Sequence, residues 1–263
     1  MKRILSISVW VLLSLGLIGI LGFVNHAQKQ MVCTDINIRI DNSNGNFFVG
    51  EEDIFGMVYH EMDTILGRPI SAIEAERLEH KINNHPSVSN AEVYKTIDGK
   101  LHVEVSQRTP IVRIFSANGD SYYLDSTGKV MPPSDKYTSR VFVASGYINE
   151  PFKKVSHLNA RTVADSLRKY VLVDDIFNMA QFIRTDPLWN AQIEQLYVNK
   201  EFEIELIPRV GNHRIVVGDA TDIKTKLDKL KVFYDKGLNK TGWNEYRVIN
   251  LKFANQVVCK KRN

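Results

Sequence analysis

The residues with the strongest chemical signature form the run Asp125-Ser126-Thr127-Gly128. An aspartic protease needs Asp-Ser/Thr-Gly without an interruption, and it needs two carboxylates that share one proton. Here an extra residue separates the aspartate from the glycine, and the chain contains a single copy of the run. We therefore predict that these residues form a turn between two strands.

The seven histidines are too scattered to predict a metal site. None has the H-x-x-x-H or H-E-x-x-H spacing that places two imidazoles on one helix face. His80 and His85 are five residues apart, so on one helix they would diverge by about 140°. The chain has no G-x-S-x-G and no glycine-rich phosphate loop. We expect no catalytic residue, no metal and no cofactor. A hydrolase whose catalytic Asp or Glu residues are scattered along the chain stays as the alternative, because motifs need not be local.

Composition excludes several broad classes of protein. The 263 residues are 44% hydrophobic and 24% charged, as in an average globular protein. The net charge of +4 is small and scattered, so we expect no nucleic-acid partner. The chain has only two cysteines, Cys33 and Cys259, which excludes a disulfide scaffold. They could pair in an oxidising compartment, or each could be a small apolar residue.

An uncharged run of 21 residues, Ile4 to Val24, lies near the N-terminus. As a helix it would reach roughly 31 Å, which matches the hydrocarbon core of a bilayer. Lys2 and Arg3 precede the run, so we predict a cytoplasmic N-terminus and an extracytoplasmic remainder. A cleaved signal peptide is the alternative, but its apolar region would be shorter, and Asn25 and His26 make a poor cleavage site before Ala27.

A small α+β module is predicted after the juxtamembrane linker 25–33. Thr34–Asp41 alternates like a half-buried strand, and Glu51–Ile65 has one apolar helical stripe. Ser71-Ala72-Ile73-Glu74 has the form of a capping box and predicts a second helix that stops before Pro86. Two strands around a turn at Asp98-Gly99 complete a β-α-α-β-β order. The predicted core consists of Ile36, Ile38, Ile54, Val58, Ile73, Leu78, Val103 and Val105.

The chain after Pro110 predicts a larger β-rich domain with flanking helices. Short apolar strands alternate with turns. Helices are expected near Val163–Arg184, either continuous or broken near Leu172–Asp174, and at Thr221–Lys236, the latter ended by Gly237. The run Tyr246–Val258 reads as one long final strand. The predicted organisation is therefore 1–24 for the cytoplasmic end and transmembrane helix, 25–33 for the linker, 34–109 for the small module, 110–259 for the β-rich domain and 260–263 for a basic tail.

The order of several short motifs resembles the FtsQ/DivIB family of bacterial cell-division proteins. The anchor, the β-α-α-β-β module with Gly67-Arg68-Pro69-Ile70 between its helices, and the hairpin that ends near Gln107-Arg108-Thr109-Pro110 look like a POTRA domain behind a membrane anchor. The later motifs, in the order seen in that family, are Tyr123-Leu124-Asp125, Gly128-Lys129-Val130, Val141–Gly146, Leu206-Ile207-Pro208-Arg209 and Val248-Ile249-Asn250-Leu251-Lys252-Phe253.

The resemblance implies a non-catalytic divisome scaffold. Such proteins hold small bitopic coiled-coil partners, the FtsB- and FtsL-like proteins, and the POTRA-like module is implicated in contacts with other divisome membrane proteins. The implied location is the cytoplasmic (inner) membrane, as a single-pass protein with its bulk in the periplasm, enriched at the division septum. Besides the membrane-anchored cell-wall hydrolase, a POTRA-type chaperone or secretion component is an alternative.

The final run carries the predicted partner site. Strand parity places Arg247, Ile249, Leu251, Phe253 and Val257 on a face that packs on the domain. If the strand lies at a sheet edge, as the resemblance implies, its unpaired backbone groups can accept a partner strand. The alternative is an internal strand with no free edge. The predicted partner-binding residues are Asn250, Lys252, Phe253, Ala254, Asn255, Gln256 and Val258. On this interpretation, a proline at Ala254 or Asn255 should abolish capture.

Overall fold

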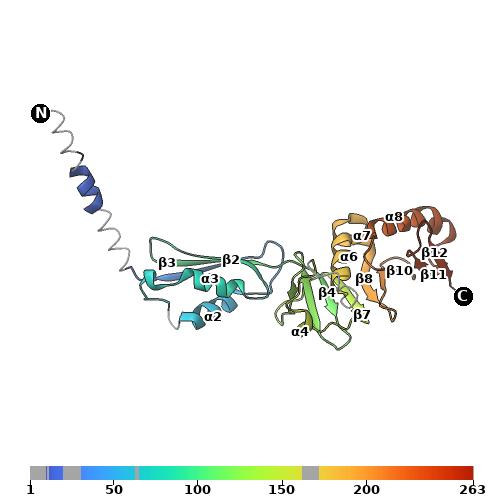
Figure 1. Cartoon of the computed structure of the whole chain (residues 1–263), viewed down its shortest axis with the longest axis horizontal. Helices are drawn as coiled ribbons and strands as arrows, with labels where there is room; N and C mark the ends of the chain where they lie inside the picture. The colour runs from blue at the N-terminus through green and yellow to red at the C-terminus, as the bar shows by residue number, and fades with distance from the viewer. Residues whose placement is uncertain (1–9, 11, 20–30, 63–64, 162–171, 263) are drawn as a thin grey trace. The chain divides into compact units, whose positions relative to one another are not determined.

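The computed structural model describes residues 10, 12–19, 31–62, 65–161 and 172–262. The chain divides into two compact units, Met1–Gln107 and Arg108–Asn263 (Figure 1). Each unit has its own sheet and its own set of buried apolar residues.

The first unit is a three-stranded sheet with two helices. The β-α-α-β-β order is the one predicted, with a short 3₁₀ turn before the second helix. The elements are β1 (Asp35–Asp41), α2 (Glu51–Met62), η1 (Ile70–Ala72), α3 (Ala75–Asn83), β2 (Val88–Lys95) and β3 (Lys100–Gln107). The central strand β3 pairs in parallel with β1 and antiparallel with β2.

The core of the first unit agrees with the predicted set except at its edge strand. Residues Ile54, Val58, Ile73, Leu78, Val103 and Val105 are all buried. Ile36 and Ile38 are only half-buried, because β1 has a neighbour on one side only. The predicted capping box is wrong. Ser71 and Ala72 lie in η1, and α3 begins at Ala75 after Glu74, whose side chain makes no cap hydrogen bond.

The second unit is built on one mixed nine-stranded sheet. Its strands are β4 (Pro110–Phe115), β5 (Ser121–Asp125), β6 (Val130–Met131), β7 (Phe142–Gly146), β8 (Ile193–Val198), β9 (Ile204–Pro208), β10 (Arg214–Gly218), β11 (Tyr246–Asn250) and β12 (Val258–Lys261). Their order in the sheet is β12-β11-β10-β9-β8-β7-β4-β5-β6. The C-terminal strand β12 is therefore an edge strand.

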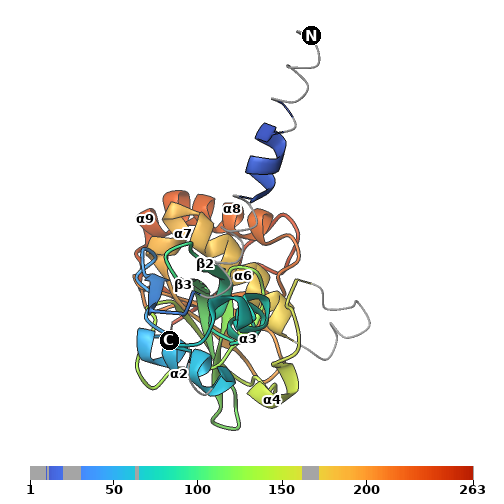
Figure 2. The same ribbon diagram turned by 90° about the vertical axis from the view of Figure 1, so that its left-hand side faces the viewer.

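Helices cover the sheet of the second unit (Figures 1 and 2). They are α4 (Phe152–Val155), α6 (Val173–Thr185), α7 (Pro187–Gln192), α8 (Ile223–Phe233), the π-helical turn η2 (Tyr234–Leu238) and α9 (Asn239–Thr241). Helix α6 buries Ile176, Phe177 and Ile183 in the same core to which α8 contributes Leu227 and Leu230. This burial fixes α8 beside the C-terminal strands.

One helical segment of the second unit ends later than predicted, and another is described only in part. The helix predicted over Val163–Arg184 is described from Val173, and residues 162–171 lie outside the described part of the chain. Gly237 does not end the other helix. The chain continues through η2 and α9 and leaves the helix at Gly242, whose φ of 99° suits a glycine.

The predicted transmembrane helix over residues 4–24 falls largely outside the described residues. Within that run only residues 10 and 12–19 are described, and they are helical. No helix in the described part of the chain is both long and apolar enough to cross a bilayer.

Candidate partner-binding edge

The C-terminal run is a hairpin and not the single strand that we predicted. Strand β11 ends at Asn250, residues 251–257 form a loop, and β12 begins at Val258. β11 lies inside the sheet, parallel to β10 and antiparallel to β12. The predicted edge therefore moves from residues 246–258 to the short strand Val258–Lys261.

Polar contacts hold residues 251–257 in a loop, and the alternation that predicted a strand here does not reveal them. The Asn250 side-chain oxygen accepts the amide of Lys252 at 3.0 Å. From α8, the ammonium of Lys229 donates to the carbonyl oxygens of Leu251 and Phe253, at 3.0 and 2.6 Å. Asn255 has a φ of 58°, in the left-handed region that asparagine tolerates.

Only part of the predicted apolar face packs on the domain. Ile249 and Leu251 are fully buried, and Val257 is half-buried against the core. Phe253 was predicted to be buried with them, but 44% of it is exposed because the chain has already turned into the loop. Arg247, predicted on the same face, is exposed at a bulge of β11.

The outer edge of β12 offers unpaired main-chain groups. The amide of Arg262 donates to the Glu245 carbonyl at 3.0 Å, towards β11. Because N–H groups alternate along a strand, the amides of Val258 and Lys260 also face β11, whereas those of Cys259 and Lys261 face outwards. Within the described residues, no strand pairs with that outer side.

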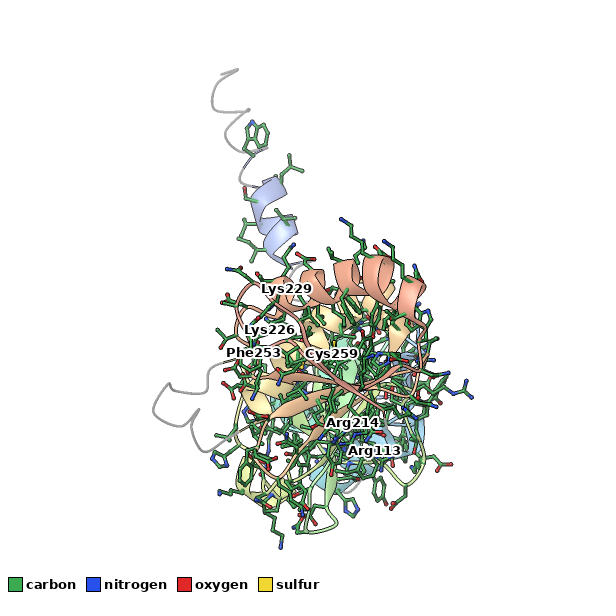
Figure 3. The ribbon with its side chains drawn as sticks, turned by 90° about the vertical axis from the view of Figure 1, so that its right-hand side faces the viewer. Arg113, Arg214, Lys226, Lys229, Phe253 and Cys259 are labelled. Carbon is green, nitrogen blue, oxygen red and sulfur yellow. The ribbon has the colours of Figure 1, made fainter. Side chains whose placement is uncertain are left out.

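A groove borders this edge on the side of α8. Its volume is about 640 Å³. Apolar atoms come from Val232, Phe233 and Val257, and Val257 directly precedes the edge strand. Val232 is 53% exposed, an unusual position for an apolar side chain on this amphipathic helix. Figure 3 shows Lys229, Phe253 and Cys259 on this side of the unit.

Positive charge surrounds the edge. Lys260, Lys261 and Arg262 are exposed. Lys261 forms an ion pair with Glu245 at 3.0 Å, and the hydrogen bond from this ammonium raises the pKa of Lys261. Lys252, in the loop, pairs with Glu203 of the turn before β9. Burial raises the pKa of the Cys259 thiol, and both cysteines of the chain are free.

The structure brings the predicted site residues to one hairpin but in different settings. Asn250 closes β11, Lys252, Phe253, Ala254, Asn255 and Gln256 lie in the loop, and Val258 opens β12. Sequence reasoning missed Lys229, Val232 and the outward groups of Cys259 and Lys261. The exposed apolar Val232 lies off the stripe of α8 and was a usable signal, whereas the outward amides depend on a register that the sequence does not show.

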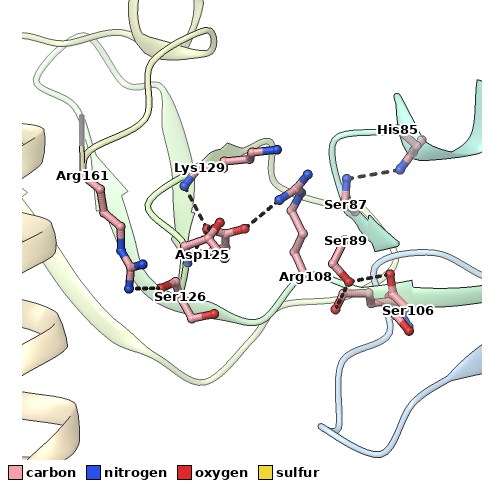
Figure 4. A network of polar contacts seen from close by, with 11 residues as sticks. His85, Ser87, Ser89, Ser106, Arg108, Asp125, Ser126, Lys129 and Arg161 are labelled. Carbon is pink, nitrogen blue, oxygen red and sulfur yellow. Dashed lines mark hydrogen bonds and ion pairs between the residues drawn. The ribbon is translucent and has the colours of Figure 1, made fainter. Parts of the chain in front are cut away.

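The motif that suggested catalysis is a turn organised by the buried side chain of Asp125. One Asp125 oxygen accepts from the Thr127 amide at 2.8 Å, the Thr127 hydroxyl at 2.7 Å and the Lys129 amide at 2.8 Å. The other oxygen accepts from Arg108 at 2.9 Å (Figure 4). The three contacts with Thr127 and Lys129 hold the turn between β5 and β6 that the sequence predicted, and the Arg108 contact ties it to the residue pair before β4. Within the described residues, no cluster of His, Cys, Asp or Glu could hold a metal ion.

His213 is likewise structural. It is buried, and its Nε2 lies 2.9 Å from the hydroxyl of Tyr234 in η2. Trp243 packs against both rings. Burial lowers the pKa of His213, so the imidazole stays neutral inside an aromatic cluster that holds the end of the α8 segment on the domain.

Comparison with known proteins identifies the family. Residues 109–260 match the family model "FtsQ/DivIB, C-terminal related", and residues 31–106 match the POTRA-like domain. A cell division protein FtsQ of Rhodothermus marinus is 23% identical over 199 residues, which cover 74% of this chain and 68% of that protein. A second FtsQ, of Syntrophotalea carbinolica, is 22% identical over 264 residues, which cover 98% of this chain and 86% of that protein. The chain thus belongs to the FtsQ/DivIB family of cell-division proteins, which are not enzymes.

Proposed function

We propose that this protein is a membrane-anchored divisome scaffold that captures a small bitopic division protein by strand addition at β12. The observation that carries the proposal is the open edge of β12, where Cys259 and Lys261 direct their amides outwards. Strand addition uses such main-chain donors for affinity and adjacent pockets for specificity. The groove beside Val257 supplies such a pocket.

The chemistry of the edge describes the partner. Lys260, Lys261 and Arg262 favour an acidic segment. The groove favours a large apolar side chain near one end of the added strand. An FtsB-like or FtsL-like protein is the partner that family membership favours, and other divisome membrane proteins would contact the POTRA-like unit.

The N-terminal run supports a location in the cytoplasmic membrane. Its 21 residues carry no charge, and the described part is helical with exposed apolar side chains, among them Trp10, Leu13 and Leu17. With Lys2 and Arg3 in the cytoplasm, both units would lie in the periplasm. Enrichment at the septum then follows from the partners that the protein holds. No observation favours the hydrolase or the secretion component.

The test is a proline at an outward-facing amide. Cys259→Pro removes a donor to the partner but no bond to β11, because edge strands tolerate proline where the N–H faces solvent. Cys259→Ala keeps the amide and is the matched control. We expect binding of an FtsB-like partner to the full chain to fall at least about tenfold for Cys259→Pro and to be unchanged for Cys259→Ala. Calorimetric titration in detergent measures the affinities, and melting curves check folding. Full binding by a folded Cys259→Pro protein would refute strand addition.

A further inference from the structure

At one end of the POTRA-like unit, the segment by which the chain enters the unit lies beside two turns. The Ile70 amide donates to the Met31 carbonyl at 2.8 Å, and the Gly67 amide donates to the Cys33 carbonyl at 2.8 Å. The Thr34 amide donates to Gly99 at 2.9 Å. The segment 31–34 is therefore held between the turn that precedes η1 and the turn that joins β2 to β3. We call this end of the unit the entry end.

Large apolar side chains are exposed at the entry end. Ile97, at the tip of the β2–β3 turn, is 81% exposed, the highest value of any large apolar side chain in the described part of the chain. Val32, Tyr59 and Leu66 are between 42% and 52% exposed. Tyr59 and Leu66 together line a small apolar cavity of about 60 Å³. An exposed apolar cluster of this kind has no role in the core of the unit.

The charges around the entry end suit a lipid surface. Arg68, whose carbonyl accepts the Cys33 amide at 2.7 Å, is exposed, and Lys95, also exposed, donates to the Ile73 carbonyl at 3.0 Å. The carboxylate of Asp98, next to Ile97 at the tip, forms an ion pair with the ammonium of Lys100 at 3.5 Å, so these two residues add no net charge. Binding in a membrane interface grows with the apolar area buried among the acyl chains and with the attraction of basic residues to anionic lipids.

Chain length directs this end towards the bilayer. Only residues 25–30 separate the uncharged run from Met31. Seven residue steps span at most about 25 Å, so the entry end cannot move farther than that from the membrane. The opposite end of β3, at Gln107, lies about 23 Å along the strand from Lys100, which is at the entry end. The tether thus keeps Ile97 at high local concentration near the lipid surface.

We propose that the entry end of the POTRA-like unit docks on the outer surface of the same membrane, with Ile97 inserted at the boundary between headgroups and acyl chains and Val32, Tyr59 and Leu66 resting beside it. This inference depends on the membrane anchor of the proposed function. Docking would fix which end of the unit faces the lipid and which is presented to other proteins.

Tryptophan quenching by brominated lipids tests the proposal. The full chain is reconstituted in vesicles of phosphatidylethanolamine and phosphatidylglycerol whose acyl chains are brominated near the headgroup. Ile97→Trp is made in a Trp10→Phe background, and the emission of that background, which retains Trp189 and Trp243, is subtracted so that the difference reports on the tip. Phe47→Trp in the same background is the matched control. Phe47 is 53% exposed, and the hydrogen bond from Gln107 to the neighbouring Asn46 places it at the opposite end of the unit.

We expect the brominated lipid to quench most of the added emission of Ile97→Trp and to leave that of Phe47→Trp unchanged. Equal emission of Ile97→Trp in brominated and ordinary vesicles would overturn the docking, and equal quenching of both variants would overturn the orientation. The difference in emission between the native chain and its Trp10→Phe variant provides the separate test of the anchor, because Trp10 lies within the uncharged run. Quenching of Trp10 without quenching at position 97 would refute only the docking, whereas no quenching of Trp10 would refute the anchor as well.

Discussion

Asp125→Ala should destabilise the second unit strongly without removing any chemistry. The carboxylate is 2% exposed, and it accepts three hydrogen bonds on one oxygen and the Arg108 guanidinium on the other. The Arg108 side chain is itself only 11% exposed. Removing one partner of a buried ion pair typically costs about 3–5 kcal/mol of unfolding free energy, because the remaining charge stays desolvated.

Urea titration followed by tryptophan emission measures this loss of stability in the second unit. Two of the three tryptophans, Trp189 and Trp243, lie in the second unit, and Trp10 belongs to the N-terminal run. A shift of the transition midpoint at constant slope then reports the change in stability. Asp125→Asn keeps an acceptor for the turn amides and should lose less, about 1–3 kcal/mol.

Asp228→Ala is the control for charge removal as such. Asp228 pairs with Lys224 at 2.7 Å, a contact shorter than that of Asp125 with Arg108, but both side chains are largely exposed. Exposed pairs contribute little, so the midpoint should not move measurably. A midpoint for Asp125→Ala equal to that of wild type would refute the structural role and would reopen the hydrolase alternative.

Three further predictions concern the core, the response to pH and the topology. Leu78→Ala removes a side chain that is 1% exposed and should cost the POTRA-like unit about 2–5 kcal/mol, measured by thermal unfolding followed by circular dichroism; a melt within a degree or two of wild type would contradict the assigned core. Burial raises the pKa of Glu150 above its usual value, so the charged carboxylate destabilises the fold. Stability is therefore lost as the pH rises from the usual pKa of a glutamate through the raised pKa of Glu150. Glu150→Gln, which keeps an acceptor for the Leu172 amide, should therefore raise the melting temperature at pH 7 and not at pH 4, and an equal effect at both would contradict the cause given. A reporter active only in the cytoplasm, fused after Asn263, should be silent, and a mature N-terminus near Gln28 would contradict the anchor.

Local patterns were enough to predict the order of elements in the first unit. Apolar periodicity predicted the strands and helices, and five of the eight predicted core positions are 1% exposed or less, including Ile54, Leu78 and Val103. The capping box failed because Pro69 starts a 3₁₀ turn at Ile70, which uses the residues that would have begun the helix. A sequence motif at a helix start competes with the turn that precedes it.

The final hairpin was mispredicted for a tertiary reason. Ile249, Leu251 and Phe253 alternate as a strand would, but Lys229, from a helix more than twenty residues earlier, binds the carbonyls of Leu251 and Phe253 and holds the chain in a loop. Asn250 and Asn255 were the local signs of a turn. The proline substitutions at Ala254 and Asn255, which the single-strand interpretation suggested, therefore do not test strand addition. At Asn255 a proline is incompatible with the φ of 58° and would distort the loop, whereas the open amides lie at Cys259 and Lys261.

The same residues that open the edge of β12 also restrict what can pair with it. An exposed edge strand invites pairing with a second copy of the chain, and short length and lysines are the usual protection. β12 has only four residues, two of which are Lys260 and Lys261, and Arg262 follows directly. Two copies paired at this edge would bring like charges together, which costs free energy, whereas an acidic partner strand would gain from the same contact. The basic end of the chain thus disfavours self-association while it leaves the main-chain donors of the edge accessible to a different protein.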